Sequence, residues 1–421
     1  MADSETIVQA ALQPQRRGIK QNTFAALKHR NYRLYFSGQL ISLTGMWMQN
    51  TAQPWLVYQL TGSPLYLGIV SFSSSIPALT LALWAGVFVD RVPKRVLLLL
   101  TQTAEALLAT FLAIDVFLGW VQPWHVVIFA ILNGVVNVFD APARQAFVIE
   151  MVGRDDLTNA VALNSATFQM GRIIGPSLAG IFLALVGPAW CFLLNGFSFL
   201  AVIWALLRMQ VQDAKPAPRI GSAVAQLREG VGYIWNDRIV RTLFAMVAVS
   251  NIFAIGYTAL LPAFARDVLE TGPTGFGLMG AAIGVGALIG ALTVATLGSS
   301  ARKGILLTAG NVLLPVMVLA FSVSRVFPIS MIILFFAGLG FMTMNTTANT
   351  LIQTSVPDHL RGRVMGAYAM IFFGFFPFSS LMAGFIAKHF SIPLGAAFGG
   401  AVALTFALLW IWRAPHIRKL V

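Results

Sequence analysis

The chain alternates long apolar stretches with short polar ones over almost its whole length of 421 residues. About 20 apolar residues in a helix cross a hydrocarbon core of roughly 30 Å, so each stretch is long enough to span a membrane. The runs are continuously apolar and lack the alternation of membrane β-strands, which predicts an all-α membrane protein. Twelve transmembrane helices are predicted, at 34–60, 65–89, 96–118, 123–143, 162–183, 190–207, 242–264, 275–298, 304–324, 327–350, 364–387 and 391–412.

The longest polar connection separates the sixth predicted helix from the seventh. It contains a Lys-Pro-Ala-Pro sequence at 215–218 and an amphipathic stretch at 224–235, which is typical of a helix lying in the membrane interface. The pattern therefore predicts two six-helix bundles joined by a cytoplasmic linker. The predicted division is a tail at 1–32, a first bundle at 33–208, the linker at 209–241, a second bundle at 242–412 and a tail at 413–421.

Short sequence similarities relate the two halves. The segment Val152-Gly-Arg-Asp-Asp-Leu-Thr-Asn-Ala-Val161 precedes the fifth helix, as Val356-Pro-Asp-His-Leu-Arg-Gly-Arg-Val364 precedes the eleventh. Ser177-Leu-Ala-Gly180 corresponds to Leu381-Met-Ala-Gly384, and Thr61-Gly62 corresponds to Thr271-Gly272. Parallel repeats of six helices are typical of transporters that bind substrate near the membrane midplane.

Composition supports the membrane assignment. Charged residues make up only 10% of the chain and hydrophobic residues 57%, with a mean hydropathy of +0.78, whereas soluble domains carry about 25% charged residues. The single cysteine, Cys191, excludes a disulfide framework and a cysteine-based metal site. The first apolar run is too long for the core of a cleavable signal peptide, so we expect it to remain as the first helix.

The net charge of +13 reflects membrane orientation. With a cytoplasmic N-terminus, 24 of the 28 lysines and arginines fall on cytoplasmic segments. Only Arg266, Arg325 and Lys388 lie outside, and Arg172 lies within a span. By the positive-inside rule, both termini are cytoplasmic and the protein is a multi-pass protein of the cell inner membrane. A nucleic-acid partner is therefore not predicted.

The connection between the second and third helices carries a candidate gating motif, Gly86-Val-Phe-Val-Asp90-Arg91-Val-Pro93-Lys94-Arg95. Gly86 permits close helix approach, and Asp90 at a helix end can accept hydrogen bonds from the N-terminus of a neighbouring helix. These interactions would hold the two halves in one conformation. An ordinary positive-inside loop explains Arg91, Lys94 and Arg95 but not the other two residues.

A second motif lies in the fifth helix and reads Gly171-Arg172-Ile-Ile-Gly175-Pro176-Ser-Leu-Ala-Gly180. Glycines four residues apart present a flat face to another helix, and Pro176 bends the helix axis. Ordinary packing of small residues is the alternative explanation for this pattern.

The two motifs resemble signatures of the major facilitator superfamily. The first is similar to the pattern G-x-x-x-D-R-x-G-R-R/K, although Pro93 replaces the second glycine, and its counterpart at 298–304 lacks the aspartate. The second resembles the antiporter signature G-x-x-x-G-P-x-x-G-G, which implies packing between the halves and export. Similarity to the branch of enterobactin exporters and macrolide-type efflux proteins extends over Asp140-Ala-Pro142-Ala-Arg144-Gln145-Ala-Phe, Glu150-Met-Val and Asn159-Ala-Val-Ala-Leu-Asn164. The fourth helix lacks the outer-half arginine that many proton antiporters of the superfamily carry.

Ionisable residues inside the predicted spans are candidates for ion coupling, since a charge in the membrane costs several kcal/mol. Glu105, Asp115, Asp140 and Arg172 meet this condition, whereas the cores of helices seven to twelve carry none. Glu105 and Arg172 lie at a similar depth, about 15 Å from the cytoplasmic side, and pairing is predicted, either as a titratable switch or as a fixed ion pair. Asp115 is either a coupling residue or solvated near the outer end, and Asp140 either carries protons or pairs with Arg144 or residues 91–95.

Neutral polar residues recur on one face of the first and fourth helices, which predicts that this face avoids lipid. Resemblance to facilitators implies that helices one, four, seven and ten line the substrate cavity. The predicted lining residues are Gln49, Asn50, Gln53, Asn133, Asn137, Asn251, Tyr257, Asn345 and Asn349. Phe372, Phe373, Phe375 and Phe376 form either an aromatic wall of this cavity or a lipid-facing cluster.

These patterns predict a secondary transporter that exports a small organic molecule, drug-like or siderophore-like, by alternating access and proton antiport. No phosphate-binding G-x-x-x-x-G-K-[S/T] sequence is present, so ATP is not the direct energy source. The five histidines lie near helix ends without metal-ligand spacing, so neither an enzyme, a metal site nor a cofactor is predicted. The expected partners are the substrate, the proton and the lipid bilayer, and a monomer is expected. An importer of a small metabolite and a non-transporting membrane sensor are the alternatives.

Overall fold

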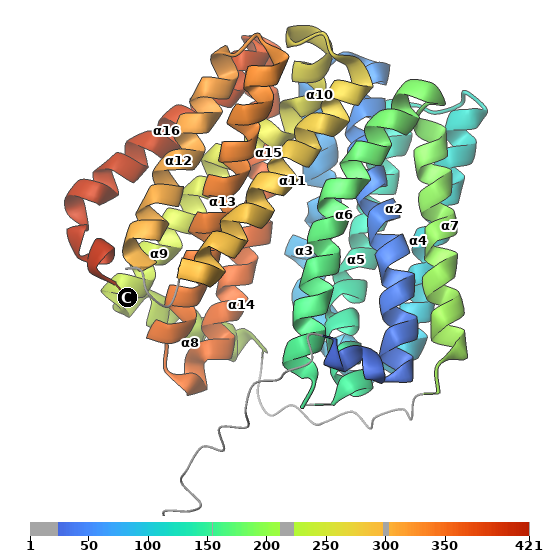
Figure 1. Cartoon of the computed structure of the whole chain (residues 1–421), viewed down its shortest axis with the longest axis horizontal. Coiled ribbons are helices and arrows are strands. Elements are labelled where there is room, and N and C mark those ends of the chain that lie inside the picture. The colour runs from blue at the N-terminus through green and yellow to red at the C-terminus, as the bar shows by residue number, and fades with distance from the viewer. Residues whose placement is uncertain (1–23, 154, 211–222, 298–302, 421) are drawn as a thin grey trace, which may run out of the picture.

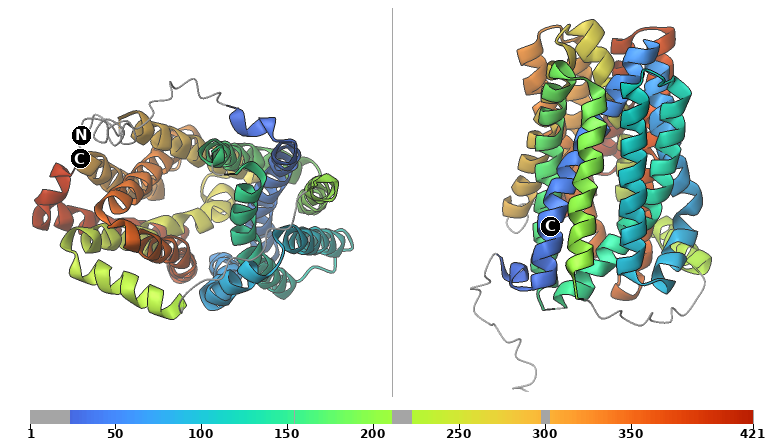
Figure 2. Two further views of the ribbon diagram at one scale, coloured as in Figure 1. Left: turned by 90° about the horizontal axis from the view of Figure 1, so that it is seen from below. Right: turned by 90° about the vertical axis from the view of Figure 1, so that its right-hand side faces the viewer.

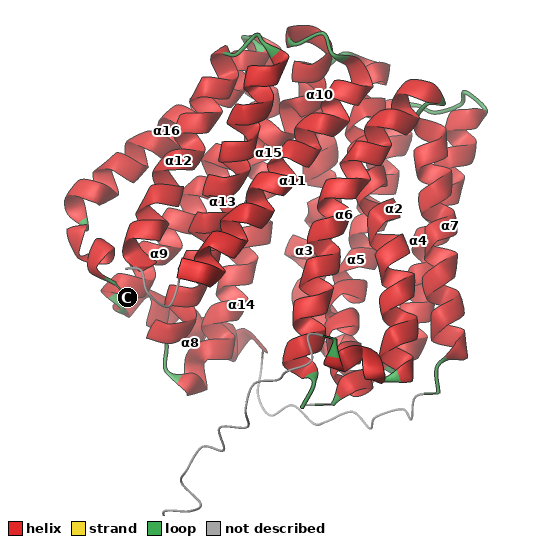
Figure 3. Ribbon diagram, in the orientation of Figure 1, coloured by secondary structure: helices red, strands yellow, loops and turns green. Residues whose placement is uncertain are grey.

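The computed structural model describes residues 24–153, 155–210, 223–297 and 303–420. Parts of the predicted N-terminal tail and linker, and most of the second-half counterpart of the gating motif, lie outside these ranges. Within the described residues every regular element is a helix, as the sequence predicts (Figure 3).

The helices of the first half follow one another with short connections (Figure 1). Among their contacts, α2 packs on α6 and α7, α3 packs on α5, and α4 packs on α5 and α7. After the short 3₁₀ helix Ala25–Lys28, the helices are α2 (Arg30–Thr61), α3 (Pro64–Arg91), α4 (Lys94–Phe117), α5 (Pro123–Val152), α6 (Leu157–Leu185) and α7 (Pro188–Arg208).

The second half begins with α8 (Ala223–Asn236), which confirms that the predicted amphipathic stretch is helical. A composite helix follows, consisting of α9 (Arg238–Val249), the π-helical segment Ser250–Ala254, the 3₁₀ segment Ile255–Leu260, α10 (Leu261–Ala263) and a second π-helical segment, Phe264–Val268. The remaining helices are α11 (Gly272–Leu297), α12 (Lys303–Val323), α13 (Phe327–Ser355), α14 (Asp358–Gly374), α15 (Phe376–His389), α16 (Ile392–Arg413) and the 3₁₀ helix Pro415–Lys419.

Eleven helices in the described residues are long and apolar enough to cross a membrane. The composite helix Arg238–Val268 counts as one of them, as does the pair α14 and α15. Helix α2 is 32 residues long but is not among the eleven, because glutamine, asparagine, serine and threonine residues interrupt its apolar sequence. The chain is thus a multi-pass membrane protein.

The break between α14 and α15 divides the predicted eleventh helix. Helix α14 ends at Gly374, and α15 begins at Phe376 with Pro377 in its first turn. Proline has no backbone N–H to donate to the preceding turn, so the continuous helix ends here. The sequence analysis predicted a single helix over 364–387 because it used only the length and apolarity of this run, and these do not locate the break before Pro377.

The repeated Thr-Gly pair has the same backbone role in both halves. Gly62 follows α2 with φ +57° and Gly272 begins α11 with φ +64°, both in the left-handed region that favours glycine. The Gly62 N–H donates to the Tyr58 carbonyl and so closes the end of α2. The sequence similarity between these pairs therefore reflects a shared turn geometry.

The two groups of helices contact each other through α6 with α11 and α3 with α15. At Gly277 a Cβ atom would lie 2.4 Å from the Pro176 carbonyl oxygen, and at Gly68 it would lie 2.7 Å from that of Ser380. These residues lie in the last half of α6 and the first parts of α11, α3 and α15, near one end of the molecule. In Figure 1 the ribbons of the two groups diverge toward the opposite end, which carries α8 and the start of α2. Figure 2 shows the same arrangement from below and from the side.

A small polar cluster attaches the start of the described chain to α6. The Asp156 carboxylate lies 2.7 Å from both the Lys28 ammonium and the His29 imidazole. These two partners hold the pKa of the Asp156 carboxyl below its ordinary range. These ion pairs therefore join the segment before α2 to the start of α6.

Candidate functional site

A buried polar network connects α4 and α5. Asp140 is 1% exposed and forms an ion pair with Arg144, one helical turn further on. Thr101 and Gln102 donate hydrogen bonds to the Asp140 Oδ1 atom at 2.7 Å and 2.9 Å. The prediction that Asp140 pairs with Arg144 is confirmed. Arg144 also donates to the Gln39 side-chain oxygen at 3.2 Å, so the network extends to α2.

Glu105 is the second carboxylate of this region and is 5% exposed. Asn133 donates to its Oε2 atom at 2.5 Å, and Asn137 donates to its Oε1 atom at 3.0 Å. Both donors are neutral amides on α5, and Glu105 has no ion pair with any described residue. The fields of Asp140 and Arg144 act on Glu105, so the two carboxylates and the arginine form one electrostatic group.

The predicted pairing of Glu105 with Arg172 is wrong. Helix α4 packs mainly on α5 and α7, whereas α6 packs mainly on α2 and α11, so equal depth does not bring the two side chains together. The Arg172 guanidinium instead lies over the Trp47 ring, with its Cζ atom 6.0 Å from the ring centroid.

Asp115, near the other end of α4, has a partner that the sequence analysis did not assign. The His125 Nδ1 atom lies 2.7 Å from the Asp115 carboxylate. His125 occupies the first turn of α5, where it also takes part in a capping box with Gln122. The side-chain pair therefore joins the two helices on either side of this connection.

The gating motif lies at the junction of α3 and α4. Lys94 donates to the carbonyl oxygens of Val89 at 2.7 Å and Val92 at 3.1 Å, at the end of α3. Arg95 donates to the carbonyl oxygen of Leu206 at 2.8 Å, at the end of α7. Cations at helix C-termini are stabilised by the helix dipole. In this conformation these two side chains bind within the first half.

The antiporter-like motif presents two faces. A Cβ atom at Gly175 would lie 2.4 Å from the Cβ atom of Trp47, so this glycine faces α2. A Cβ atom at Gly180 would lie 3.1 Å from the Gly277 Cα atom, so this glycine faces α11 in the other half. Gly171 faces α2, as Gly175 does, and Pro176 faces α11. The motif therefore lies between α2 and the second half.

Charged and aromatic residues join the two halves where α2 ends. The Tyr58 hydroxyl donates to the Asp267 carboxylate, and Arg266 donates to the Tyr58 carbonyl oxygen at 3.2 Å. Trp55 stacks on Phe276 with the ring centroids 5.7 Å apart. Sequence analysis missed this cluster because Arg266 counted only as an outer loop charge. The adjacency of Arg266 and Asp267 beside the repeated Thr-Gly turn was the available signal.

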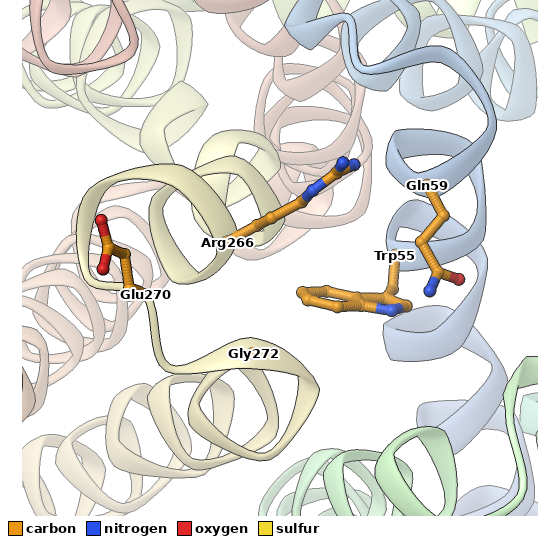
Figure 4. A pocket seen from close by; sticks show the side chains of 5 residues that line it. All are labelled: Trp55, Gln59, Arg266, Glu270 and Gly272. Atoms are coloured by element: carbon orange, nitrogen blue, oxygen red, sulfur yellow. The ribbon is translucent and has the colours of Figure 1, made fainter.

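A cavity of about 490 Å³ adjoins this cluster. Figure 4 shows the side chains that line it. They are Trp55 and Gln59 of α2, Arg266 near the end of the composite helix, Glu270 in the connection that follows it, and Gly272 at the start of α11.

The predicted cavity-lining residues have different environments. Gln49 accepts a hydrogen bond from Asn195 of α7 at 2.7 Å, so its amide serves the contact between α2 and α7. Asn50 is exposed and Gln53 is half-buried.

Asn251 and Asn345 each donate to a carbonyl four residues earlier in their own helices, and Asn349 accepts from Gln353 at 2.6 Å. Phe372 stacks on Tyr368 with the ring centroids 6.3 Å apart, so it packs within the second half.

Comparison with known families identifies the chain. A family model described as a transmembrane secretion effector matches residues 21–419. The chain belongs to this family. As a member of the transmembrane secretion effector family, it is a transporter of the major facilitator superfamily and not an enzyme.

Named relatives of this family member are efflux and siderophore transport proteins. The chain is 29% identical to the multidrug efflux pump Tap of Mycolicibacterium fortuitum, over 88% of this chain and 92% of that protein. It is 25% identical to the staphyloferrin A transporter of Staphylococcus aureus, over 85% of this chain and 90% of that protein. Identity to the enterobactin exporter EntS of Salmonella typhimurium is also 25%, over 81% of each chain.

Solved structures of other transporters share the fold. The nucleoside transporter NupG superposes with a TM-score of 0.70 at 13% identity, covering 92% of this chain and 98% of that chain. A bacterial homologue of the human lysosomal transporter Spinster, in an inward-facing and unoccupied conformation, superposes with a TM-score of 0.67 at 12% identity, covering 95% and 97%.

Proposed function

We propose that this transmembrane secretion effector exports a small organic molecule across the cell inner membrane in exchange for protons. The observation that carries the proposal is Glu105, a buried carboxylate held by two neutral amides beside the Asp140–Arg144 ion pair. A carboxylate without a cation in contact can gain and lose a proton without breaking an ion pair. Asp140 is bound to Arg144 and Asp115 to His125, so Glu105 is the carboxylate best suited to carry the proton.

The proposed topology has twelve spans, with α2 as the first. Its polar side chains bind other helices: Gln39 accepts from Arg144, and Gln49 accepts from Asn195. Polar residues paired within a bundle are tolerated inside a membrane. With both termini cytoplasmic, residues 33–208 and 242–412 form the two six-helix bundles of a monomer. Helix α8 lies in the cytoplasmic interface, joined to α14 by the ion pair of Glu229 with Arg363.

Transport proceeds by alternating access of a central site to the two sides of the membrane. In the proposed topology, the contacts of α6 with α11 and of α3 with α15 lie on the outer side. In this proposal, the state with these contacts is the one closed to the outside. Binding of substrate or proton shifts the population between this state and the outward-open one.

Gly277→Ala is expected to shift this population toward the outward-open state. The new methyl group would lie 2.4 Å from the Pro176 carbonyl oxygen and 2.7 Å from the Gly180 Cα atom, both backbone atoms that cannot rotate away. The overlap exists only when the outer side is closed. Distances between spin labels on the outer ends of α6 and α11 should increase. Gly366→Ala is the control, since a Cβ atom there has nothing within 4 Å. Equal spin-label distances in both variants would contradict the proposal that the α6–α11 contact closes the outer side.

Asp90→Asn is expected to reduce transport severely while protein abundance stays near that of the wild type. The substitution removes a charge at the end of α3 without altering volume, and a gating interaction with the second half depends on that charge. Lys94→Arg is the matched control, because an arginine can still donate to the carbonyls at the end of α3. Flux assays normalised to protein abundance measure transport by the two variants. Normal flux in Asp90→Asn would remove the gating role.

The relatives support export and suggest the substrate class. Tap is named a multidrug efflux pump and EntS an enterobactin exporter. We infer a drug-like or siderophore-like substrate for this chain. Comparing the intracellular accumulation of a dye, a macrolide and a siderophore, with and without the protein, tests this inference. Lower accumulation of at least one compound supports export, and higher accumulation would favour the alternative of an importer.

A further inference from the structure

Arg172 is a cation in the middle of α6 whose charge has no counter-ion among the described residues. Its side chain is half-buried and makes neither a hydrogen bond nor an ion pair there. Its contact is the Trp47 ring, whose centroid lies 6.0 Å from the Arg172 Cζ atom, at the outer limit of a cation–π interaction. A charge inside a membrane costs at least a few kcal/mol, so the cation–π contact alone does not compensate it. The environment of Arg172 therefore favours an added negative charge.

Three residues in the region of this cation carry buried hydrogen-bond donors. The Trp47 Nε1, Gln169 Nε2 and Tyr257 hydroxyl atoms are buried and have no hydrogen-bond partner in the described residues. Buried donors are normally paired, so each donor without a partner calls for an explanation. All three groups can donate to an acceptor oxygen.

These donors lie on α2, on α6 and on the 3₁₀ segment Ile255–Leu260. The Trp47 ring of α2 lies against Gly171, where a Cβ atom would be 3.0 Å from its Cδ1 atom. Gln169 precedes Arg172 by three residues and thus lies on the same face of α6. Tyr257 comes from the other half of the protein, is 2% exposed, and lies within the range of Coulomb interaction with Arg172.

This position is at the inner limit of the close contact between α6 and α11. A Cβ atom at Gly284 would lie 3.0 Å from the Arg172 carbonyl oxygen, and the glycines nearer the outer end of α11 meet Pro176 and Gly180. Groups from both halves therefore meet around one cation at about the middle of the membrane. A ligand bound here would contact both halves and would respond to their separation.

We propose that Arg172, Trp47, Gln169 and Tyr257 form a receptor for an anionic group of the exported molecule, a carboxylate or an ionised phenol. The proposal rests on the export function proposed above. A guanidinium matches the two oxygens of a carboxylate, and the charge-assisted hydrogen bonds that it forms are about twice as strong as neutral ones. The neutral donors would satisfy the remaining lone pairs of the anion. Siderophores that bind iron through carboxylates or phenols carry such groups.

Ligand binding to the purified protein in nanodiscs tests the receptor. The probes are a citrate-based polycarboxylate siderophore without iron and its methyl ester, compared by isothermal titration calorimetry at pH 7. The wild type is expected to bind the acid about tenfold or more tightly than the ester, since a hydrogen bond to a charged group contributes about 1.5–3 kcal/mol. Arg172→Gln should bring the two affinities together, and Arg172→Lys should keep part of the preference.

Conservative variants separate the receptor from a structural role. Tyr257→Phe removes only the hydroxyl group and should weaken binding of the acid but not of the ester, with the protein folded as judged by its melting temperature. Arg208→Gln is the matched control, because Arg208 also lies over a tryptophan ring, that of Trp204, at 5.6 Å, but at the end of α7. This control should keep the full preference for the acid.

Two results would overturn the proposal: equal binding of acid and ester by the wild type, or a preference that survives Arg172→Gln. Binding requires neither a proton gradient nor a direction of transport. A preference for the acid in a protein that imports, or that ignores the gradient, would therefore refute the proposed export function and leave the receptor intact. Export that continues although the protein binds acid and ester equally would refute the receptor and leave the proposed export function intact.

Discussion

Glu105→Gln is expected to abolish proton-driven export while the substrate still binds. Glutamine keeps the shape of the side chain, but its neutral amide can neither gain nor lose a proton. The glutamine oxygen can still accept from one of Asn133 and Asn137, and the other asparagine must turn its amide so that its oxygen accepts from the new NH₂ group. Export in energised membrane vesicles and substrate affinity in nanodiscs measure the two properties separately.

Asp358→Asn is the matched control for this experiment, because Asp358 is 89% exposed and pairs with Arg361 at the start of α14. This variant should export normally. If Glu105→Gln also exports normally under a proton gradient, Glu105 is structural, and Asp115 or Asp140 is the next candidate. If the corresponding amide variants of all three residues export normally, coupling through a first-half carboxylate is wrong.

Asp140→Asn is expected to destabilise the folded protein by about 3–5 kcal/mol, because it leaves the Arg144 charge without its partner in a buried network. Asparagine keeps the volume of the side chain and can still accept a hydrogen bond from Thr101. The loss of stability therefore reports on the ion pair with Arg144. The melting temperature and the folded yield in detergent should both fall clearly.

The double variant Asp140→Asn/Arg144→Gln tests whether the charge is the cause. Removing the second charge eliminates the unpaired cation, so the melting temperature should recover much of the loss. Additive destabilisation by the two substitutions would contradict an ion-pair role. It would indicate that each side chain contributes through separate contacts.

The periodicity of the chain predicted most of the fold, since a membrane requires long apolar helices whatever their tertiary contacts. Two features needed the structure. The composite helix Arg238–Val268 contains π-helical and 3₁₀ segments that have no simple sequence signal, and α15 begins at Phe376 after a break in the predicted eleventh helix.

The candidate site was predictable where residues are close in sequence and less so where helices must be placed side by side. Asp140 and Arg144 are one helical turn apart, so their pairing followed from spacing alone. Depth in the membrane was not enough to identify the partner of Glu105, because depth does not say which helices are neighbours. Tyr58 and Asp267 are 209 residues apart, and no local pattern relates them.

Flux into inverted membrane vesicles tests the central claim most directly. In these vesicles the cytoplasmic face points outward, so export appears as accumulation inside. The vesicle interior is made acidic, and the compound is one whose accumulation in cells the protein lowers. We predict that wild-type vesicles accumulate this compound and that a protonophore abolishes the accumulation. Vesicles with Glu105→Gln should show no accumulation. Accumulation by right-side-out vesicles instead, or accumulation that a protonophore leaves unchanged, would contradict proton-coupled export.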